Sequence, residues 1–435
     1  MAKSILDSTA SLNPSVLMAK IKSNDGKKTI DLKDGFVTLQ YGEHLFGDSV
    51  DIAFAYSDTG VRGLSVSEDL PIYRTEDIRF KFADGTGLVL DVSLNVDKIE
   101  KISSNTTNSN VMLHCVSEEL MRNELVDANV EIRYDGRVSD SIRKICEDNL
   151  KITKKLFIEE SANNFNFLGN GHKSLYTLNW LSKHAIPSRD GKTGDSAGCL
   201  FYENYNVIYF KSIDGLFAQK PIKKFTFTNN PKFNTVEFDG AILRMDEDKQ
   251  ANALSQLRIG AYDTKLVTFD PRTRQYVEIE DKAESSVKGT TTAGKNLPIL
   301  NEKFKSESSR KTFMMTDTGS MPTGDTKEQV AKNNKKNFDV ENVLNQAIRR
   351  YNQILSQQIS ITIAGDFSLH VGDTISISKP SLDESRGGNI DKFTSGKYLI
   401  TDLCHYLTPT EVFTKLSLAR DTFNRKSERR DTLTK

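Results

Sequence analysis

The sequence predicts an α+β fold that is mainly β, with two small antiparallel β-barrels and an intervening α+β module. Apolar and polar residues alternate near the C-terminus, in ISITIAGDFSLHVGDTISIS from Ile359, and again between residues 36 and 96. Between these two regions apolar residues recur every three or four positions. Successive side chains of a strand point to opposite faces, so the alternation predicts strands with one apolar face, whereas the wider spacing predicts helices.

Residues 1–125 are expected to form the first barrel. FVTLQYGEHLFGDSVDIAFAYSDTG predicts two strands, separated by a loop at residues 42–48 and followed by a turn at residues 57–60. The next cluster alternates through Ile78 to Phe82, turns at residues 83–87 and alternates again through Val89 to Val96. A closed barrel would leave no unpaired strand edge.

Residues 126–220 are expected to form the α+β module. SDSIRKICEDNL begins with a Ser or Asp cap and predicts a helix whose buried stripe contains Ile142, Ile145, Cys146 and Leu150. SLYTLNWLSKHAI predicts an amphipathic helix that is ended by Pro187, and we expect its Trp180 to lie in a domain core. CLFYENYNVIYF predicts a hairpin with its turn at residues 204–206, followed by a helical turn at residues 212–217.

The remaining chain divides into three parts. Residues 221–280 are β-rich, but their assignment is left open. Residues 281–340 are rich in Ser, Thr, Gly, Lys and Asn, so they cannot bury enough apolar area to offset ordering and are expected to form a flexible polar arm or linker. Residues 341–435 are expected to form a helix, capped by Asp339, and the C-terminal barrel. The strands predicted for this barrel are 359–363, 367–371, 375–377, 397–403 and 412–419.

Composition excludes several classes of function. Lys and Arg number 59, as do Asp and Glu, so no overall basic field is present to hold DNA or an acidic membrane. At 435 residues the chain has room for about three domains. No apolar run reaches the roughly 18 residues of a membrane helix, and MAKSILDSTA lacks the apolar core of a secretory signal. Four scattered cysteines suit reduced thiols, so we expect synthesis and retention in a cytoplasm.

No catalytic, cofactor-binding or metal-binding residue is expected. Gly191-Lys192-Thr193 resembles the end of a phosphate-binding loop, but Ile186 stands where that loop needs its first glycine. The separations of His172, His184 and Cys199 match no zinc-ligand pair. Cys404 and His405 are neighbours on a predicted strand, so they point to opposite faces and cannot act as nucleophile and base. We therefore expect no enzyme activity.

Four blocks of sequence carry a resemblance to a known family. They are YGEHLFGDSVDIAFAYSDTG with LPIYRTEDIRFKFADG, SDSIRKICEDNL, SAGCLFYENYNVIYFKSIDGLF, and ISITIAGDFSLHVGDTISI with SGKYLITDLCHYLTPTEVFTKLSLARDTF. In this order they resemble the baseplate hub protein of contractile-tailed, T-even-like bacteriophages, which is related to myophage tail hub proteins and to the trunk of type VI secretion spikes. The positions that carry it are Glu43, Leu70, Pro71, Glu76, Gly372, Asp373, Gly396, Tyr398, His405, Arg420 and Asp421.

The resemblance implies a structural protein of the virion tail baseplate, assembled in the host bacterial cytoplasm. Its two barrels would be tube-like domains, and a homotrimer would present six of them as a pseudo-sixfold ring that leaves a channel for DNA. The implied partners are a central spike protein, which can carry a lysozyme domain, a tail tube or tube-initiator protein and baseplate wedge proteins. Tight nucleic-acid binding and membrane insertion are not expected.

Two alternatives remain open at this point. A carbohydrate- or receptor-binding tail module would use Tyr202, Tyr205 and Tyr209 as a sugar platform. A hydrolase would need catalytic residues that are distant in sequence and converge in the fold.

Overall fold

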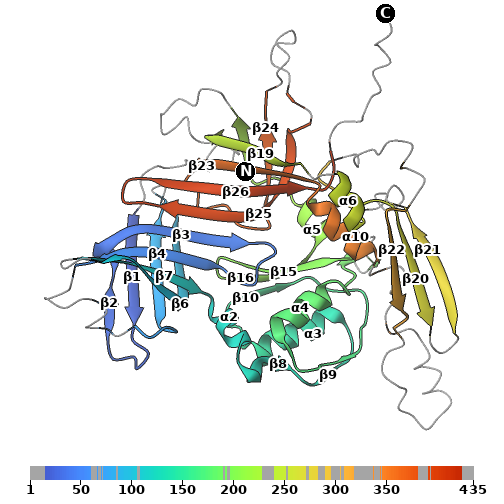
Figure 1. The fold of residues 1–435 in the computed structure, drawn as a ribbon, viewed down its shortest axis with the longest axis horizontal. Coiled ribbons are helices and arrows are strands. Elements are labelled where there is room, and N and C mark those ends of the chain that lie inside the picture. The colour runs from blue at the N-terminus through green and yellow to red at the C-terminus, as the bar shows by residue number, and fades with distance from the viewer. Residues whose placement is uncertain are drawn as a thin grey trace, which may run out of the picture.

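The computed structural model describes residues 15–59, 66, 70, 72–84, 87–104, 108–189, 192–193, 196–227, 240–250, 253–270, 274–282, 290–294, 304, 308–317, 337, 343, 345–380, 390–391 and 393–423. The predicted fold class is confirmed, because the chain is mainly β with large antiparallel sheets and a helical module (Figure 1). Among the described residues, no helix is long and apolar enough to cross a membrane.

The N-terminal sheet has the strand order β3-β4-β7-β6-β5-β1-β2, and every pair in it is antiparallel. Alternation buries one face, for example Ile78, Phe80 and Phe82 of β5. In the described part of the chain β1 and β3 are not paired, and the 3-10 helix η1 (Lys33–Gly35) contacts β1 and β4. Its strands are β1 (Ser15–Lys22), β2 (Thr29–Asp31), β3 (Phe36–His44), β4 (Asp51–Asp58), β5 (Asp77–Ala83), β6 (Val89–Ser104) and β7 (Ser109–Val116).

The C-terminal strands form a closed barrel in the order β18-β17-β24-β25-β26-β23-β19. It closes because β18 leads directly into β19 through Leu243, whose N–H donates to the carbonyl of Thr362 at 2.9 Å. The strands are β17 (Lys224–Phe227), β18 (Ala241–Ile242), β19 (Arg244–Gln250), β23 (Gln357–Ala364), β24 (Thr374–Ser378), β25 (Gly396–Leu407) and β26 (Val412–Arg420). The segment 221–280, left unassigned from sequence, thus supplies part of this barrel.

The predicted strand at residues 367–371 is wrong, because this segment is a loop. Carboxylates take the place of a strand ladder as hydrogen-bond acceptors. The amide of Ser368 donates to Asp366 at 3.1 Å, and the amide of His370 donates to Asp373 at 3.1 Å. The apolar side chains of the segment are nevertheless buried. The alternation therefore predicts their burial correctly but predicts the wrong backbone conformation.

Both sheets have the same strand order. In chain order β1, β3, β4, β5, β6 and β7 correspond to β17, β19, β23, β24, β25 and β26, and the corresponding strands also have the same neighbours in space. The β1–β5 pair is antiparallel whereas the β17–β24 pair is parallel. The short β3–β4 connection corresponds to the long segment between β19 and β23. Two sequence regions without evident similarity therefore adopt one strand arrangement.

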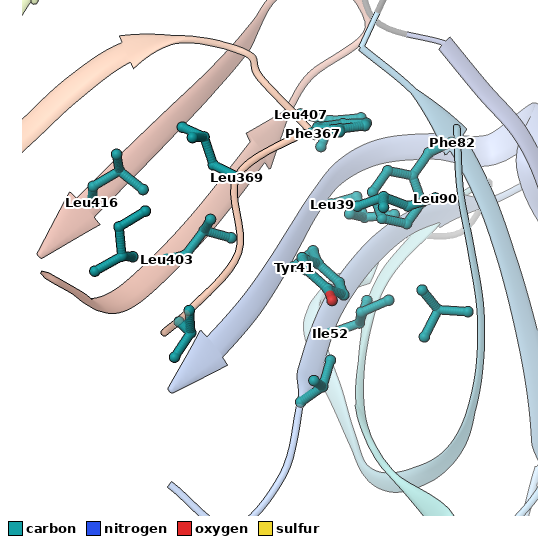
Figure 2. Close-up of a cluster of buried hydrophobic side chains, with 14 of the residues drawn as sticks. Leu39, Tyr41, Ile52, Phe82, Leu90, Phe367, Leu369, Leu403, Leu407 and Leu416 are labelled. Carbon is teal, nitrogen blue, oxygen red and sulfur yellow. The ribbon is translucent and has the colours of Figure 1, made fainter. Parts of the chain in front are cut away.

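The two sheets are joined edge to edge within the chain. β25 pairs antiparallel with β3, from Asp402 opposite His44 to Leu407 opposite Leu39. Figure 2 shows the shared core at this seam, with Leu39 and Tyr41 of β3 near Leu403 and Leu407 of β25. The result is one continuous antiparallel path, β19-β23-β26-β25-β3-β4-β7-β6.

The α+β module lies between residues 118 and 218 and has its own core. The predicted stripe of Ile142, Ile145, Cys146 and Leu150 is fully buried. The predicted hairpin and its following helix are confirmed, but the helix expected to reach Pro187 ends earlier, at Ser182. Its elements are α2 (Glu118–Asn123), η2 (Val126–Ala128), β8 (Asn129–Val130), β9 (Arg133–Tyr134), α3 (Val138–Lys144), η3 (Ile145–Asn149), β10 (Lys155–Ile158), β11 (Phe167–Leu168), β12 (His172–Lys173), α4 (Ser174–Ser182), β13 (Ser188–Arg189), β14 (Lys192–Thr193), β15 (Cys199–Asn204), β16 (Val207–Ser212) and α5 (Ile213–Ala218).

The long segment between β19 and β23 contains a further small sheet. Its order is β21-β20-β22, and β22 (Arg310–Met315) lies within the predicted polar arm, so that part of the arm is an ordered strand. Much of the arm, and the predicted cap Asp339, lie outside the described residues. The other elements are α6 (Ala253–Ile259), β20 (Thr264–Asp270), β21 (Gln275–Asp281) and α10 (Asn345–Ile354).

Candidate functional site

The N-terminal sheet, the α+β module and the C-terminal barrel meet around one buried carboxylate, Glu43 of β3. Its Oε1 accepts from the hydroxyl of Tyr41 at 2.7 Å, from the amide of Tyr205 at 3.0 Å and from Nδ1 of His370 at 3.0 Å. Its Oε2 accepts from the amide of Val371 at 2.8 Å. Because Tyr205 belongs to the β15–β16 turn and His370 to the C-terminal barrel, this carboxylate holds all three parts of the chain together.

The charges at this junction are complementary. Burial by itself would raise the pKa of Glu43, but the His370 imidazolium and the donated hydrogen bonds hold that pKa below its ordinary value. Burial likewise opposes the charge on His370, and the Glu43 carboxylate overcomes it, so the pKa of His370 is raised. Each side chain therefore favours the charged form of the other, with Glu43 fully buried and the His370 side chain 24% exposed. Such a pair fixes the relative position of the elements that contribute it, because separating the two charges leaves the Glu43 carboxylate buried and uncompensated.

Tyr205 also binds the N-terminal sheet through its side chain. Its hydroxyl accepts from the amide of Asp91 at 3.1 Å, and the neighbouring Asn206 donates from Nδ2 to the carbonyl of Asp91 at 3.3 Å. Its ring stacks on His370 with centroids 5.9 Å apart. The hairpin turn thus hydrogen-bonds to the backbone of β6 at Asp91, a residue that also lies in the pairing of β6 with β5. Without the turn, the N–H and C=O groups of Asp91 that it binds would need other partners.

Replacing Tyr205 separates these contributions. Tyr205→Phe keeps the stacked ring and the backbone bond to Glu43 but removes the acceptor for the Asp91 amide, and we expect a loss of about 1 kcal/mol of unfolding free energy. Tyr205→Ala also removes the ring, with an expected loss of about 3 kcal/mol. Urea unfolding followed by far-UV circular dichroism measures both. Equal effects of the two changes would contradict the role of the ring.

A second buried charge cluster ties the helices to the C-terminal barrel. Arg350 of α10 donates from Nη1 to Asp421 at 2.9 Å, from Nη2 to Asp214 of α5 at 3.0 Å and to the carbonyl of Thr291 at 3.1 Å. Asp421 also accepts from the amide of Ala293 at 2.9 Å. All three charged side chains are at most 2% exposed. The cluster therefore anchors α5, α10 and residues 291–293 at the end of β26.

On the outer face of the seam, His44 bridges two carboxylates. Its Nδ1 donates to Asp402 of β25 at 3.1 Å and its Nε2 donates to Asp51 of β4 at 2.9 Å. These hydrogen bonds raise the pKa of His44 to about 10, first through Asp402 and then through Asp51. Adjacent residues of β3, Glu43 and His44, thus make charged contacts to the C-terminal barrel on opposite faces of the sheet.

Three residues that were considered from the sequence as catalytic or metal-binding candidates make packing or hydrogen-bonding contacts or lie on a strand face. His405 is buried, its Nδ1 is 2.8 Å from the hydroxyl of Thr414, and burial lowers its pKa to about 3. Cys404, its neighbour, is on the opposite, partly exposed face of β25. His184 packs against Trp180 with ring centroids 4.5 Å apart. Among the described residues, no group of three or more His, Cys, Asp or Glu side chains could hold a metal ion.

The tyrosines considered as a sugar platform do not form an open surface. Tyr202 is only 3% exposed and stacks against Tyr209, with ring centroids 5.2 Å apart. Tyr205 is engaged with Asp91 and His370. The aromatic residues of the hairpin therefore pack between modules.

Sequence reasoning singled out Glu43, Gly372, Asp373 and Asp421 but missed their partners. Arg350 lay on a predicted helix and His370 in a predicted strand, so neither position signalled a buried charge. The predicted loop at residues 42–48 begins too early, because β3 continues to His44 and places Glu43 on the otherwise apolar inner face of the strand. A carboxylate buried there requires a partner.

The fold of this chain is similar to that of solved tail proteins. A tail protein from Neisseria meningitidis MC58 has a TM-score of 0.52 and 12% sequence identity, covering 94% of this chain and 97% of that one. The 43 kDa tail protein of prophage MuSo2 from Shewanella oneidensis has a TM-score of 0.52 and 11% identity, covering 93% and 99%. Prophage tail protein gp18 from Listeria monocytogenes EGD-e has a TM-score of 0.49 and 10% identity, covering 94% and 95%. No family model and no curated protein sequence matches the chain.

Proposed function

We propose that this chain is a structural subunit of the baseplate hub of a contractile phage tail, and that three copies form a pseudo-sixfold ring around the tail axis. The observation that supports this most directly is the repeated strand order of the two sheets, which are joined edge to edge through β25 and β3. Three chains with two similar modules each would present six near-equivalent modules. Such a ring can contact a threefold spike on one side and a sixfold tube on the other. The fold shared with tail proteins supports the same assignment.

The buried junctions fit a scaffold rather than an enzyme. Glu43 and Arg350 fix the modules relative to one another, and a ring that transmits load needs this rigidity. The equal numbers of acidic and basic residues fit a channel through which DNA passes, because a strongly basic bore would retain it. The proposed partners are a central spike protein, a tail tube or tube-initiator protein and the wedge proteins of the baseplate.

The mass of the purified chain in solution tests this proposal. We expect sedimentation equilibrium to give three times the mass of one chain at micromolar concentration, either alone or with the spike protein added. An obligate ring interface buries about 2,000 Å² or more, so the trimer should persist on dilution. A monomer or a dimer under both conditions would contradict the proposal.

A further inference from the structure

We infer that neighbouring copies of this chain join by antiparallel pairing of the second half of β6 (residues 97–104) with β19 (Arg244–Gln250) of the next copy. This inference rests on the proposed function, because it names the contact that would close the proposed ring. The template is the β25–β3 contact inside the chain, since β6 corresponds to β25 and β19 corresponds to β3.

β6 and β25 are built alike and change neighbours at the same point. The first part of β25 pairs with β24, an irregularity follows at Thr401, and residues 402–407 then pair with β3 on that side. The first part of β6 pairs with β5, and an irregularity follows at Asp97. Beyond Asp97, the described residues place no strand on the corresponding side of β6. β6 therefore has an edge of the kind that β25 uses to bind β3.

The exposure of this edge supports the same conclusion. Residues 97–104 are exposed apart from the half-buried Ile99, and Ile102 is 56% exposed. In the corresponding part of β25, Leu403, His405 and Leu407 are buried. Lys98, Glu100 and Lys101 give the edge of β6 the charges that discourage indiscriminate strand pairing. An exposed edge with such charges suits a specific partner strand.

β19 supplies the complementary edge. It pairs with β23 on one side, and no other strand among the described residues pairs with its residues 244–250. β3, its counterpart, uses this second side to bind β25. The side chain of Glu247 forms an ion pair with Lys379. β19 and the second half of β6, which extends beyond the pairing with β5, are the two ends of the path β19-β23-β26-β25-β3-β4-β7-β6.

The number of strands in that path favours a head-to-tail contact. Strand direction alternates along β19-β23-β26-β25-β3-β4-β7-β6, so the two end strands run in opposite directions. Placing β6 of one copy beside β19 of the next by rotation about a common axis therefore continues the antiparallel alternation without interruption. Contacts of this heterologous type close into a ring when the rotation permits it.

The register follows from matching the two sheets row by row. We take Thr401 and Asp97 as equivalent positions and follow the residue pairs from strand to strand in each sheet. On each strand, the equivalent positions are then both apolar. The matched residues are Leu403 with Ile99, Leu416 with Leu113, Ile361 with Phe54, and Met245 with Leu39.

The intrachain contact then sets which residues face each other between copies. Leu39 lies opposite Leu407, and the residue before Leu407 lies opposite the residue after Leu39. Transferred to the second contact, Met245 should face Ser104 and Asp246 should face Ser103. Asp246 and Glu247 would then lie near Lys101, so these charges of the two edges are complementary.

Disulfide trapping tests this pairing in the full-length chain. Two double variants, Ser103→Cys with Asp246→Cys and Ser104→Cys with Met245→Cys, place cysteines directly opposite each other at adjacent rows. Alternate rows of an antiparallel pair differ in Cα separation by roughly 1 Å, and both separations permit a disulfide. After mild oxidation we expect covalently linked trimers on a non-reducing gel for at least one of the two variants.

The matched control is Ser103→Cys with Glu247→Cys, whose side chains should point to opposite faces of the joint sheet and should not be linked. Each single variant measures the background of the native cysteines. A trimeric mass without cross-linking of either matched pair would overturn this pairing and leave the proposed function standing. Dimers from Ser103→Cys alone would overturn it in favour of a twofold β6–β6 contact. A monomeric mass would instead refute the ring itself.

Discussion

Replacing Arg350 by methionine should lower the free energy of unfolding by about 3–5 kcal/mol, one of the two largest effects expected from a single substitution in this chain. The guanidinium contacts Asp214, Asp421 and the carbonyl of Thr291, and the three charged groups are almost completely buried. Methionine fills a similar volume but leaves both carboxylates without their cation. Urea unfolding monitored by circular dichroism, combined with the solution mass of the variant, measures the loss.

The control for this prediction is Arg79→Met. Arg79 also makes a two-pronged contact with a carboxylate, Asp91, at 2.7 Å for both hydrogen bonds, but its side chain is 59% exposed. Surface pairs contribute little because water screens the charges. We therefore expect Arg79→Met to have a much smaller effect, and similar effects of the two changes would contradict the importance of the buried cluster.

Replacing Gly372 by alanine should lower the free energy of unfolding by about 2–5 kcal/mol, from a strained backbone and an overpacked contact together. Gly372 has a φ of +87°, which residues with a Cβ rarely adopt. A Cβ at this position would lie 2.3 Å from the hydroxyl oxygen and 2.7 Å from Cζ of Tyr202. The loop that carries Gly372 also supplies the Val371 amide to Glu43, so its displacement would disturb the three-way junction.

Gly87→Ala separates the two causes. Gly87 has a φ of +100°, but no heavy atom lies within 4 Å of the Cβ that alanine would add. Its replacement should show only the backbone cost, about 1–2 kcal/mol. Thermal and urea unfolding of both variants provide the comparison, and a Gly372→Ala protein as stable as Gly87→Ala would show that Tyr202 moves aside without cost.

The local pattern of apolar and polar residues was sufficient to predict much of the fold. The alternation through Ile78, Phe80 and Phe82 reports a buried face, and the spacing of Ile142, Ile145 and Cys146 reports a helical stripe, because both depend only on how a strand or a helix presents successive side chains. Where a segment's backbone bonds to side chains, the same pattern misleads. Residues 367–371 alternate like a strand, yet their amides are taken by carboxylates such as Glu43 and Asp373.

Only some residues of the candidate site could be predicted from the sequence. Glu43 was identified as a distinctive position but was predicted to lie in a loop, and the neighbouring sequence does not identify its partners His370 and Tyr205, which lie 327 and 162 positions away. Their meeting depends on how the modules pack. The same holds for Arg350, whose partners come from α5 and from the end of β26.

The sequence by itself determined the fold class, the positions of most strands and helices and the neutral charge of this protein, since these depend on side-chain periodicity and composition. Only the tertiary structure decided that β17, β18 and β19 complete the C-terminal barrel, that both sheets share one strand order and that β3 and β25 join them. The physical reason is that strand pairing uses backbone N–H and C=O groups, which every residue except proline offers in the same form. Which edges meet is therefore set by the packing of distant segments and not by any local signal.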